Sequence, residues 1–219
     1  MRLALLLVLC ALLTVAPAEA QRRRTPAPTK PKPAPVAALK VEPAAVTCAE
    51  LLGTGVKSHA TFCFVLAGRD PAQGVLVTIP PHTGPATLTF SLHNRHTYSE
   101  EEMKAGHGFA KYTAVIAVLS MTGELLGRGA VQSEFRAARD LFDRVSGGAG
   151  PGGVKAVAPI GNEAVSLTIP ANVEQVSLLG EVLESTPAAG RESTAPGRPV
   201  AIVSNVQVEY RPAPPARKR

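Results

Sequence analysis

Aromatic residues are scarce in this 219-residue sequence, which has no tryptophan, three tyrosines and six phenylalanines. Sugar-binding sites on β-sandwiches usually present exposed flat rings, because the C–H faces of a sugar stack on aromatic faces. The phenylalanines fall mostly on the apolar faces of predicted strands and of one predicted helix. The shortage of rings therefore argues against carbohydrate binding, which the fold predicted below would otherwise favour.

The signatures of common hydrolases and dinucleotide-binding enzymes are also missing. No G-x-S-x-G or H-E-x-x-H occurs, which excludes the nucleophile elbow and the zinc-binding helix built on those motifs. G-A-G-P-G-G at 148–153 has the dinucleotide spacing, but a predicted helix precedes it and a strand follows, the wrong order for that site. Aspartate occurs only at positions 70, 140 and 143. The sequence predicts neither an enzyme nor a cofactor.

Only three cysteines are present, and Cys10 lies in the N-terminal apolar run. The other two, Cys48 and Cys63, are enough for one disulfide in an oxidising compartment, with two buried free thiols as the alternative. The bridge closes a loop of ~15 residues, for which chain entropy predicts roughly 3 kcal/mol of stabilisation. Two cysteines without further clustered ligands do not make a zinc site, so no metal is expected here.

One long apolar run, 3–15, lies within a secretory signal pattern that covers residues 1–20. Arg2 provides the basic start, and Ala18 and Ala20 fit a signal-peptidase site. The run is shorter than the ~20 residues that a membrane-spanning helix needs, although an uncleaved anchor is the alternative. We expect a periplasmic or extracellular mature chain with no transmembrane segment after signal cleavage.

Acidic residues are absent from both ends of the expected mature chain. Residues 21–40 carry six lysines and arginines with five prolines, and residues 211–219 carry four more basic residues. Between 41 and 210, 12 lysines and arginines stand against 16 aspartates and glutamates, a net charge of −4. Proline-rich, charged segments bury too little apolar surface to fold. We therefore predict a disordered Pro-rich basic tether at 21–40, one domain at 41–210 and a disordered basic tail at 211–219.

The basic tails have two interpretations. They can solubilise the chain, or they can contact anionic polymers or lipid headgroups through charge. Because the charge lies outside the domain, the basic average is not a sign of specific nucleic-acid binding.

The body of the chain has the hydrophobic pattern of β-strands. Residues 61–67 are apolar on both faces, as in a central strand, whereas 86–92 alternate with Leu88, Phe90 and Leu92 on one face. M-T-G-E, at 121–124, predicts a hairpin turn. The strands expected are 61–67, 74–80, 86–92, 112–120, 125–131, 164–170, 176–184 and 199–210. We predict an all-β fold, a single antiparallel β-sandwich of jelly-roll or immunoglobulin-like type, with about eight strands and one or two short helices.

The best helix candidate is 133–148. Phe135, Ala138, Phe142 and Val145 form a helical stripe, and arginines and aspartates lie at ion-pair spacing on the other side. Gly147 is placed to end the helix.

A strand motif occurs twice in the body. V-L-V-T-I-P, a linker and T-L-T-F-S-L correspond to V-S-L-T-I-P, a linker and V-S-L-L-G-E-V, each a strand, a proline-ended corner and a strand. With the closing N-V-Q-V-E-Y, this pattern resembles galactose-binding-like jelly rolls, the architecture of many carbohydrate-binding modules. The resemblance covers about half of the body and rests on no signature residue. It implies a binding module and no particular ligand.

The stretch S-L-H-N-R-H-T-Y-S-E-E-E, 91–102, has the composition of a metal or acid–base site. Strand alternation places His93 and Arg95 on the solvent face of Thr87, Thr89 and Ser91, and places His96 and Tyr98 on the opposite face. The two histidines therefore do not share a metal. Ser99 and Glu102 have capping-box spacing for a short helical turn that ends at Gly106. The residues expected to bind a ligand are His93, Arg95, His96 and Tyr98.

Taken together, these features predict a non-catalytic, exported binding module of the bacterial periplasm or cell envelope. Its partner is expected to be an envelope protein or a glycan. The alternatives are a carbohydrate-binding module and a metal-dependent hydrolase that uses His93, His96 or His107. An exposed ring platform would favour sugar, and convergent histidine or glutamate side chains would favour metal.

Overall fold

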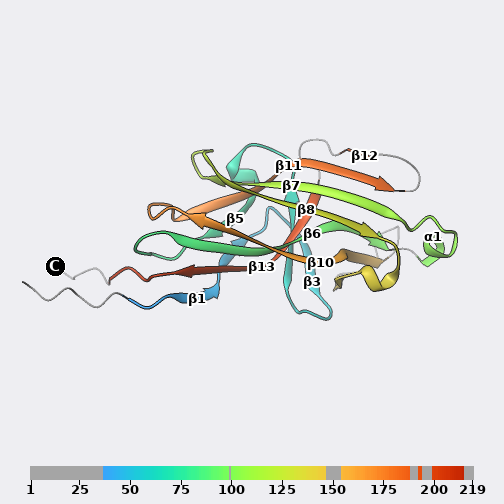
Figure 1. The fold of residues 1–219 in the computed structure, drawn as a ribbon, viewed down its shortest axis with the longest axis horizontal. Helices are drawn as coiled ribbons and strands as arrows, with labels where there is room; N and C mark the ends of the chain where they lie inside the picture. The colour runs from blue at the N-terminus through green and yellow to red at the C-terminus, as the bar shows by residue number, and fades with distance from the viewer. Residues whose placement is uncertain (1–36, 99, 147–153, 188–191, 194–198, 215–219) are drawn as a thin grey trace, which may run out of the picture. The chain divides into compact units, whose positions relative to one another are not determined.

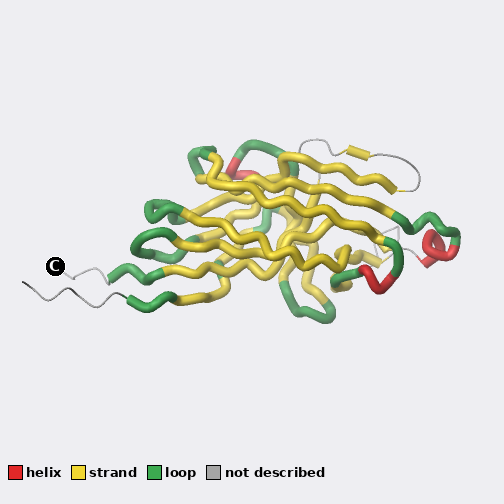
Figure 2. The backbone as a smooth tube through the Cα atoms, viewed as in Figure 1, coloured by secondary structure: helices red, strands yellow, loops and turns green. Residues whose placement is uncertain are grey.

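The computed structural model describes residues 37–98, 100–146, 154–187, 192–193 and 199–214 (Figure 1). The predicted signal peptide, most of the predicted tether, Ser99, the glycine-rich loop at 148–153 and the end of the tail lie outside these residues. Strands make up most of the described chain, as Figure 2 shows. None of the described helices is long and apolar enough to cross a membrane.

The strands form two antiparallel sheets, which confirms the predicted all-β sandwich. The first sheet contains, in spatial order, β1 (Lys40–Pro43), β13 (Pro199–Tyr210), β4 (Thr61–Leu66), β3 (Glu50–Gly55), β9 (Asp143–Ser146), β10 (Val154–Ile169) and β6 (Ala86–Tyr98). The second contains β2 (Ala45–Thr47), β5 (Val75–Thr78), β11 (Gln175–Pro187), β7 (Ala110–Ser120) and β8 (Leu125–Phe135), with β12 (Glu192–Ser193) paired to β11.

At one end the first sheet closes on itself. β13 pairs with β4 on one side, where Val203 lies opposite Cys63, and with β6 on the other, where Ile202 lies opposite His93. The remaining pairs run from β4 through β3, β9 and β10 back to β6. These strands therefore form a closed ring, and β1 pairs with the end of β13 outside it.

The closed ring has a hydrophobic core of its own, separate from the main core of the domain. The main core lies between the sheets and takes Leu88, Phe90 and Leu92 from β6. A second core is formed by Leu52, Phe62, Phe64, Val145 and Ile202, with Phe142 packed against it. Successive residues of β4 alternate between them, since Cys63 and Val65 belong to the main core. This double burial confirms the prediction that 61–67 is apolar on both faces.

Several local predictions are confirmed. Every predicted strand is present, and β6, β7, β8, β10 and β11 extend beyond the predicted bounds. The hairpin between β7 and β8 closes at Ser120–Glu124, with Gly123 at φ +85°. The short helix α1 (Glu100–Lys104) begins with three glutamates, and Gly106 follows it at φ +78°. The strand total was underestimated, because β1, β2, β3, β9 and β12 were not predicted.

The helix predicted at 133–148 is wrong. Phe135 ends β8, a single 3₁₀ turn η2 follows at Ala138–Asp140, and Asp143 begins β9. The Asp140 carboxylate accepts hydrogen bonds from the backbone N–H groups of Arg136 and Ala137, each at 2.8 Å, which competes with helical pairing. The stripe residues separate: Phe135 packs with Tyr112, whereas Val145 enters the second core. A further 3₁₀ turn, η1, lies at Pro71–Gln73.

Candidate functional site

One face of β6 changes its surroundings along the strand. Thr87 and Thr89 are half-buried, Ser91 is 5 % exposed and His93 is fully buried. The alternation predicted for this face is correct, but the solvent exposure predicted for His93 is wrong. Beyond Ser91, the closed ring covers the face with residues of the second core, which sequence alternation alone does not reveal.

His93 is built into the second core. Its Nε2 atom lies 2.8 Å from Ser204 Oγ, and its ring centroid lies 4.4 Å from that of Phe142 and 5.6 Å from that of Phe62. Nδ1 has no hydrogen-bond partner among the described residues. Burial lowers the pKa of His93 to about 4, against a smaller opposing effect of the Asp143 carboxylate. His93 is therefore neutral near pH 7 and inaccessible to a ligand.

Ser204, His93 and Asp143 are the residue types of a Ser–His–Asp triad, but the Asp143 carboxylate is hydrogen-bonded to other residues and not to His93. It accepts hydrogen bonds from Lys57 N at 3.0 Å, Arg144 N at 2.7 Å, and Ser58 N and Oγ at 2.8 and 2.6 Å. Burial acts to raise its pKa, but these hydrogen bonds together hold the pKa below its ordinary value. The carboxylate thus fixes the tip of the β3–β4 hairpin, where His59 has φ 57°.

His96 lies on the opposite face of β6 from His93, as strand alternation predicted, and contacts different residues. Its Nδ1 atom is hydrogen-bonded to the Tyr112 hydroxyl, and its ring centroid lies 3.8 Å from that of Phe135. Burial lowers its pKa to about 4. Next to it along β6, the fully buried Asn94 donates a hydrogen bond to Ser133 Oγ. These polar groups join β6 to β7 and β8 of the second sheet.

The remaining predicted site residues are Arg95, Tyr98 and His107. Arg95 lies opposite Val157 and Tyr98 opposite Val154 in the β6–β10 pair, and their side chains are outside the described structure. His107 is exposed, with Nδ1 3.4 Å from Glu102 Oε2. The described side chains contain no group of three His, Cys, Asp or Glu that could hold a metal, and His93, His96 and His107 are not brought together in one such group.

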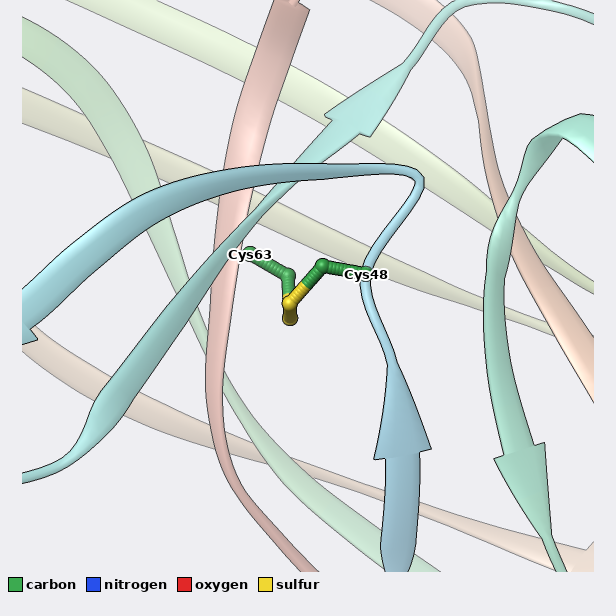
Figure 3. Close-up of a disulfide and its surroundings, with 2 residues drawn as sticks. All are labelled: Cys48 and Cys63. Atoms are coloured by element: carbon green, nitrogen blue, oxygen red, sulfur yellow. A yellow bond between two sulfur atoms is a disulfide. The ribbon is translucent and has the colours of Figure 1, made fainter.

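The predicted disulfide is present between Cys48 and Cys63, whose Cα atoms are 5.2 Å apart (Figure 3). Cys48 lies in the connection between β2 of the second sheet and β3 of the first. Cys63 lies in β4, a strand of the closed ring. Both residues pack in or against the main core. The bridge therefore ties the closed ring to the rest of the domain.

The other half of the first sheet has an outer face open to solvent. Here β13, β6 and β10 lie side by side, with Glu209 opposite Thr87 and Thr87 opposite Thr168. The next row along places Gln207 opposite Thr89 and Thr89 opposite Ser166. We call these six residues the open face: Thr87, Thr89, Ser166, Thr168, Gln207 and Glu209. Hydroxyl, amide and carboxylate groups thus form two registered rows that β-strand alternation holds away from the core.

Aromatic rings are not part of the open face. Of the aromatic side chains that the structure describes, Phe109 is the most exposed, at 36 %. Tyr112 and Tyr210 are 7 % and 5 % exposed. A stacking platform for sugar is therefore absent from the described side chains.

Comparisons with known proteins give the chain no family. No protein-family model matches the sequence, and no curated protein is significantly similar to it. Among solved structures, the fold is similar to a Clostridium thermocellum endo-1,4-β-D-xylanase 10B structure containing CBM22-1 and GH10 modules, complexed with xylohexaose. That similarity has a TM-score of 0.26 and 8 % identity, and covers 80 % of this chain but 25 % of the other. The chain thus spans about a quarter of that structure, and this degree of similarity indicates neither a ligand nor an activity.

Proposed function

We propose that this chain is a non-catalytic, exported module of the bacterial envelope that binds a partner protein through the open face. The observation that carries the proposal is the division of the first sheet. Groups suited to chemistry are enclosed at one end, whereas a registered polar face is open to solvent at the other. A rigid sheet with an exposed face is a suitable frame for binding.

The closed end supports a non-catalytic role. Ser204 and His93 are within hydrogen-bond distance, but they are 1 % and 0 % exposed, and both Asp143 oxygens already accept hydrogen bonds. A nucleophile must reach its substrate and its base must be oriented by a third group. These three residues satisfy neither condition.

A protein partner agrees better with the open face than a glycan does. The face offers hydrogen-bonding groups without aromatic rings, and Glu209 is its one formally charged side chain. Backbone and side-chain amides of a protein surface can pair with hydroxyl, amide and carboxylate groups, whereas sugar recognition on a flat sheet relies on ring stacking. Export is supported by the signal pattern together with the disulfide, which persists in oxidising compartments.

Site-specific photo-crosslinking in cells tests this proposal. A photoreactive phenylalanine analogue at Thr89 or Thr168 should give a discrete crosslinked protein, and the same probe at Ala130 should not. Ala130 is exposed on β8 of the second sheet and is the matched control. Equal labelling from Ala130 and Thr89 would refute the assigned face. Glycan-dependent adducts instead of protein adducts would favour the carbohydrate-binding alternative.

A further inference from the structure

The second half of β10 is an outer strand of the first sheet. In the open half of that sheet, formed by β1, β13, β6 and β10, residues 164–169 pair with β6 and with no other described strand. β9 pairs with β10 only at Ala156 and Val157, near the other end of the strand. An outer strand presents unpaired backbone N–H and C=O groups on the side away from its neighbour. Residues 164–169 therefore form an edge at which a further strand can add.

β8 of the second sheet covers the inner face of β10. A Cβ atom at Gly127 would lie 2.7 Å from Leu167 Cδ2, and one at Gly129 would lie 2.7 Å from Val165 Cγ1. The Leu167 and Val165 side chains thus fill the space that the two glycines leave, and both pack against the main core. The residues between them are exposed on the outer face. β8 therefore packs against β10 from within the sandwich and does not pair with its edge.

The other outer strands carry features that prevent further pairing. β1 contains Lys40 and Glu42 and ends at a proline, and β2 and β12 have only three and two residues. β8 has Arg128 and Glu134 exposed along its length. Charged residues, proline and short length are the usual means by which a sheet edge is kept from pairing with another chain. Residues 164–169 read A-V-S-L-T-I and contain neither a charged residue nor a proline.

The strand that best complements this edge is β10 itself in the reverse direction. Residues directly opposite each other in an antiparallel pair lie on the same face of the sheet. A pair of β10 strands centred on Ser166 places Ser166 opposite its own copy, Val165 opposite Leu167, and Ala164 opposite Thr168. Apolar side chains then meet on the inner face and small side chains meet on the outer face. No charged side chain in this register opposes one of the same sign.

We propose that two copies of this chain pair through residues 164–169 of β10, antiparallel and centred on Ser166. The open halves of the two copies then form one continuous sheet with the two β10 strands at its middle. Side chains stand perpendicular to the sheet, so the two open faces remain accessible and become one surface. This pairing deepens the proposed function, and it rests on that function for the use of the joined surface. The pairing itself needs no partner protein.

Disulfide trapping of the purified protein tests both the pairing and its register. Opposite Cα atoms in an antiparallel pair lie about 4.5–5.5 Å apart, which fits a disulfide. Ser166→Cys should therefore form a covalent dimer under mild oxidation. Ala164→Cys should not, because its two copies would lie about 14 Å apart. The double variant Ala164→Cys and Thr168→Cys should form the dimer again, and equal trapping of the two single variants would contradict the register.

Analytical ultracentrifugation tests the pairing without added cysteines. A concentration series of the wild type should show a monomer–dimer equilibrium. Ser166→Lys places two like charges opposite each other at the centre of the pair and should raise the dissociation constant about fivefold. Ala45→Lys is the control, because Ala45 is exposed on the outer strand β2, and it should leave the constant unchanged. Circular dichroism checks that each variant is folded. A dimer that Ser166→Lys does not weaken would place the interface elsewhere.

The failure of this pairing is distinguishable from the failure of the proposed function. A wild type that stays monomeric at every concentration, with no trapping of Ser166→Cys, would overturn the pairing alone. The photoreactive probe at Thr89 still reports on the partner protein, because Thr89 lies on β6 and not on the pairing strand. A trapped dimer with no crosslinked partner from Thr89 would support the pairing and refute the proposed function.

Discussion

The first sheet has two halves that share strands but not surroundings. In the open half, Thr87 and Thr89 of β6 lie on a face that solvent reaches, whereas Ser91 and His93 of the same face are enclosed. The difference arises because β13 pairs with both β4 and β6 at the closed end, so the sheet folds over its own outer face. One side of a single strand therefore carries a solvent-exposed surface at one end and a core at the other.

The two halves also use polar residues differently. Ser204 and Asp143 of the closed half are buried and hydrogen-bonded to other buried or backbone groups. Ser166 and Thr168 of the open half are exposed. A buried polar group whose partner is lost costs much more than an exposed one, since water replaces the partner only at the surface. The comparison predicts unequal effects for similar substitutions.

The largest effect is expected for Phe62→Ala in the second core. Phe62 is fully buried and packs against both His93 and Phe142. Its truncation should lower the free energy of unfolding by about 3–5 kcal/mol through lost burial and a residual cavity. Urea denaturation measures this value, and Thr87→Ala in the open half should cost less than ~1 kcal/mol. Similar losses for the two variants would show that the closed end is not a packed core.

Removal of the disulfide should rank next. The double variant Cys48→Ala and Cys63→Ala opens a loop with a sequence separation of 15 residues. The free energy of unfolding should fall by about 3 kcal/mol according to the chain-entropy estimate. Urea denaturation of the wild type with and without reductant gives the same comparison without a substitution. An unchanged midpoint on reduction would mean that the ring holds together without this link.

Acidification should destabilise the closed end. The folded-state pKa of His93 is about 4, below the ordinary value of 6.5, so the unfolded chain takes up the proton first. This contribution to stability is present above pH 6.5, decreases as the pH falls and levels off near pH 4, for a total loss of up to ~3 kcal/mol.

Urea denaturation between pH 7 and pH 4 measures that loss. His93→Gln should flatten the profile, leaving the similar contribution of His96, whereas His107→Gln on the exposed loop should follow the wild type. A His93→Gln profile as steep as that of the wild type would show that His93 does not titrate as its burial requires.

The smallest contrast compares two serines of the first sheet. Ser204→Ala leaves the buried His93 ring without its partner and should cost about 1–3 kcal/mol. Ser166→Ala on the open face should change the unfolding free energy by less than ~0.5 kcal/mol. Chemical denaturation of the two variants at pH 7 makes the comparison, and an equally small effect at Ser204 would place His93 in a wetter environment than the structure shows.

Local pattern predicted the elements better than the assembly. The alternation of 86–92, the doubly apolar 61–67 and the M-T-G-E turn each depend on neighbouring residues, and each is confirmed. The helix predicted at 133–148 is absent because its apolar residues also suit two strands. Phe135 ends β8 and Val145 lies in β9, and the two side chains pack in separate cores. The Asp140 side chain also accepts hydrogen bonds from backbone N–H groups, which favours a turn over a helix. The spacing of the charged residues did not reveal these bonds.

The candidate site shows the same limit. The sequence pattern identifies Ser204 only as part of the strand 199–210, although a serine within A-I-V-S on a strand buried on both faces is a signal for a buried hydrogen bond. Asp143 was assigned to an exposed helix face. The residues of the open face depend on which strands lie next to β6.

By itself, the sequence determined eight of the β-strands, the disulfide partners and the separation of His93 from His96. Strand alternation depends only on neighbouring residues, and the two cysteines outside the N-terminal apolar run have only each other to pair with. Tertiary structure decided whether each face met solvent or core. Exposure depends on residues far away in the chain: Phe62 and Phe142 pack against His93, and β13 brings Tyr210 beside Lys40. Such long-range pairings are selected by the packing of the whole domain, and no short stretch of residues contains them.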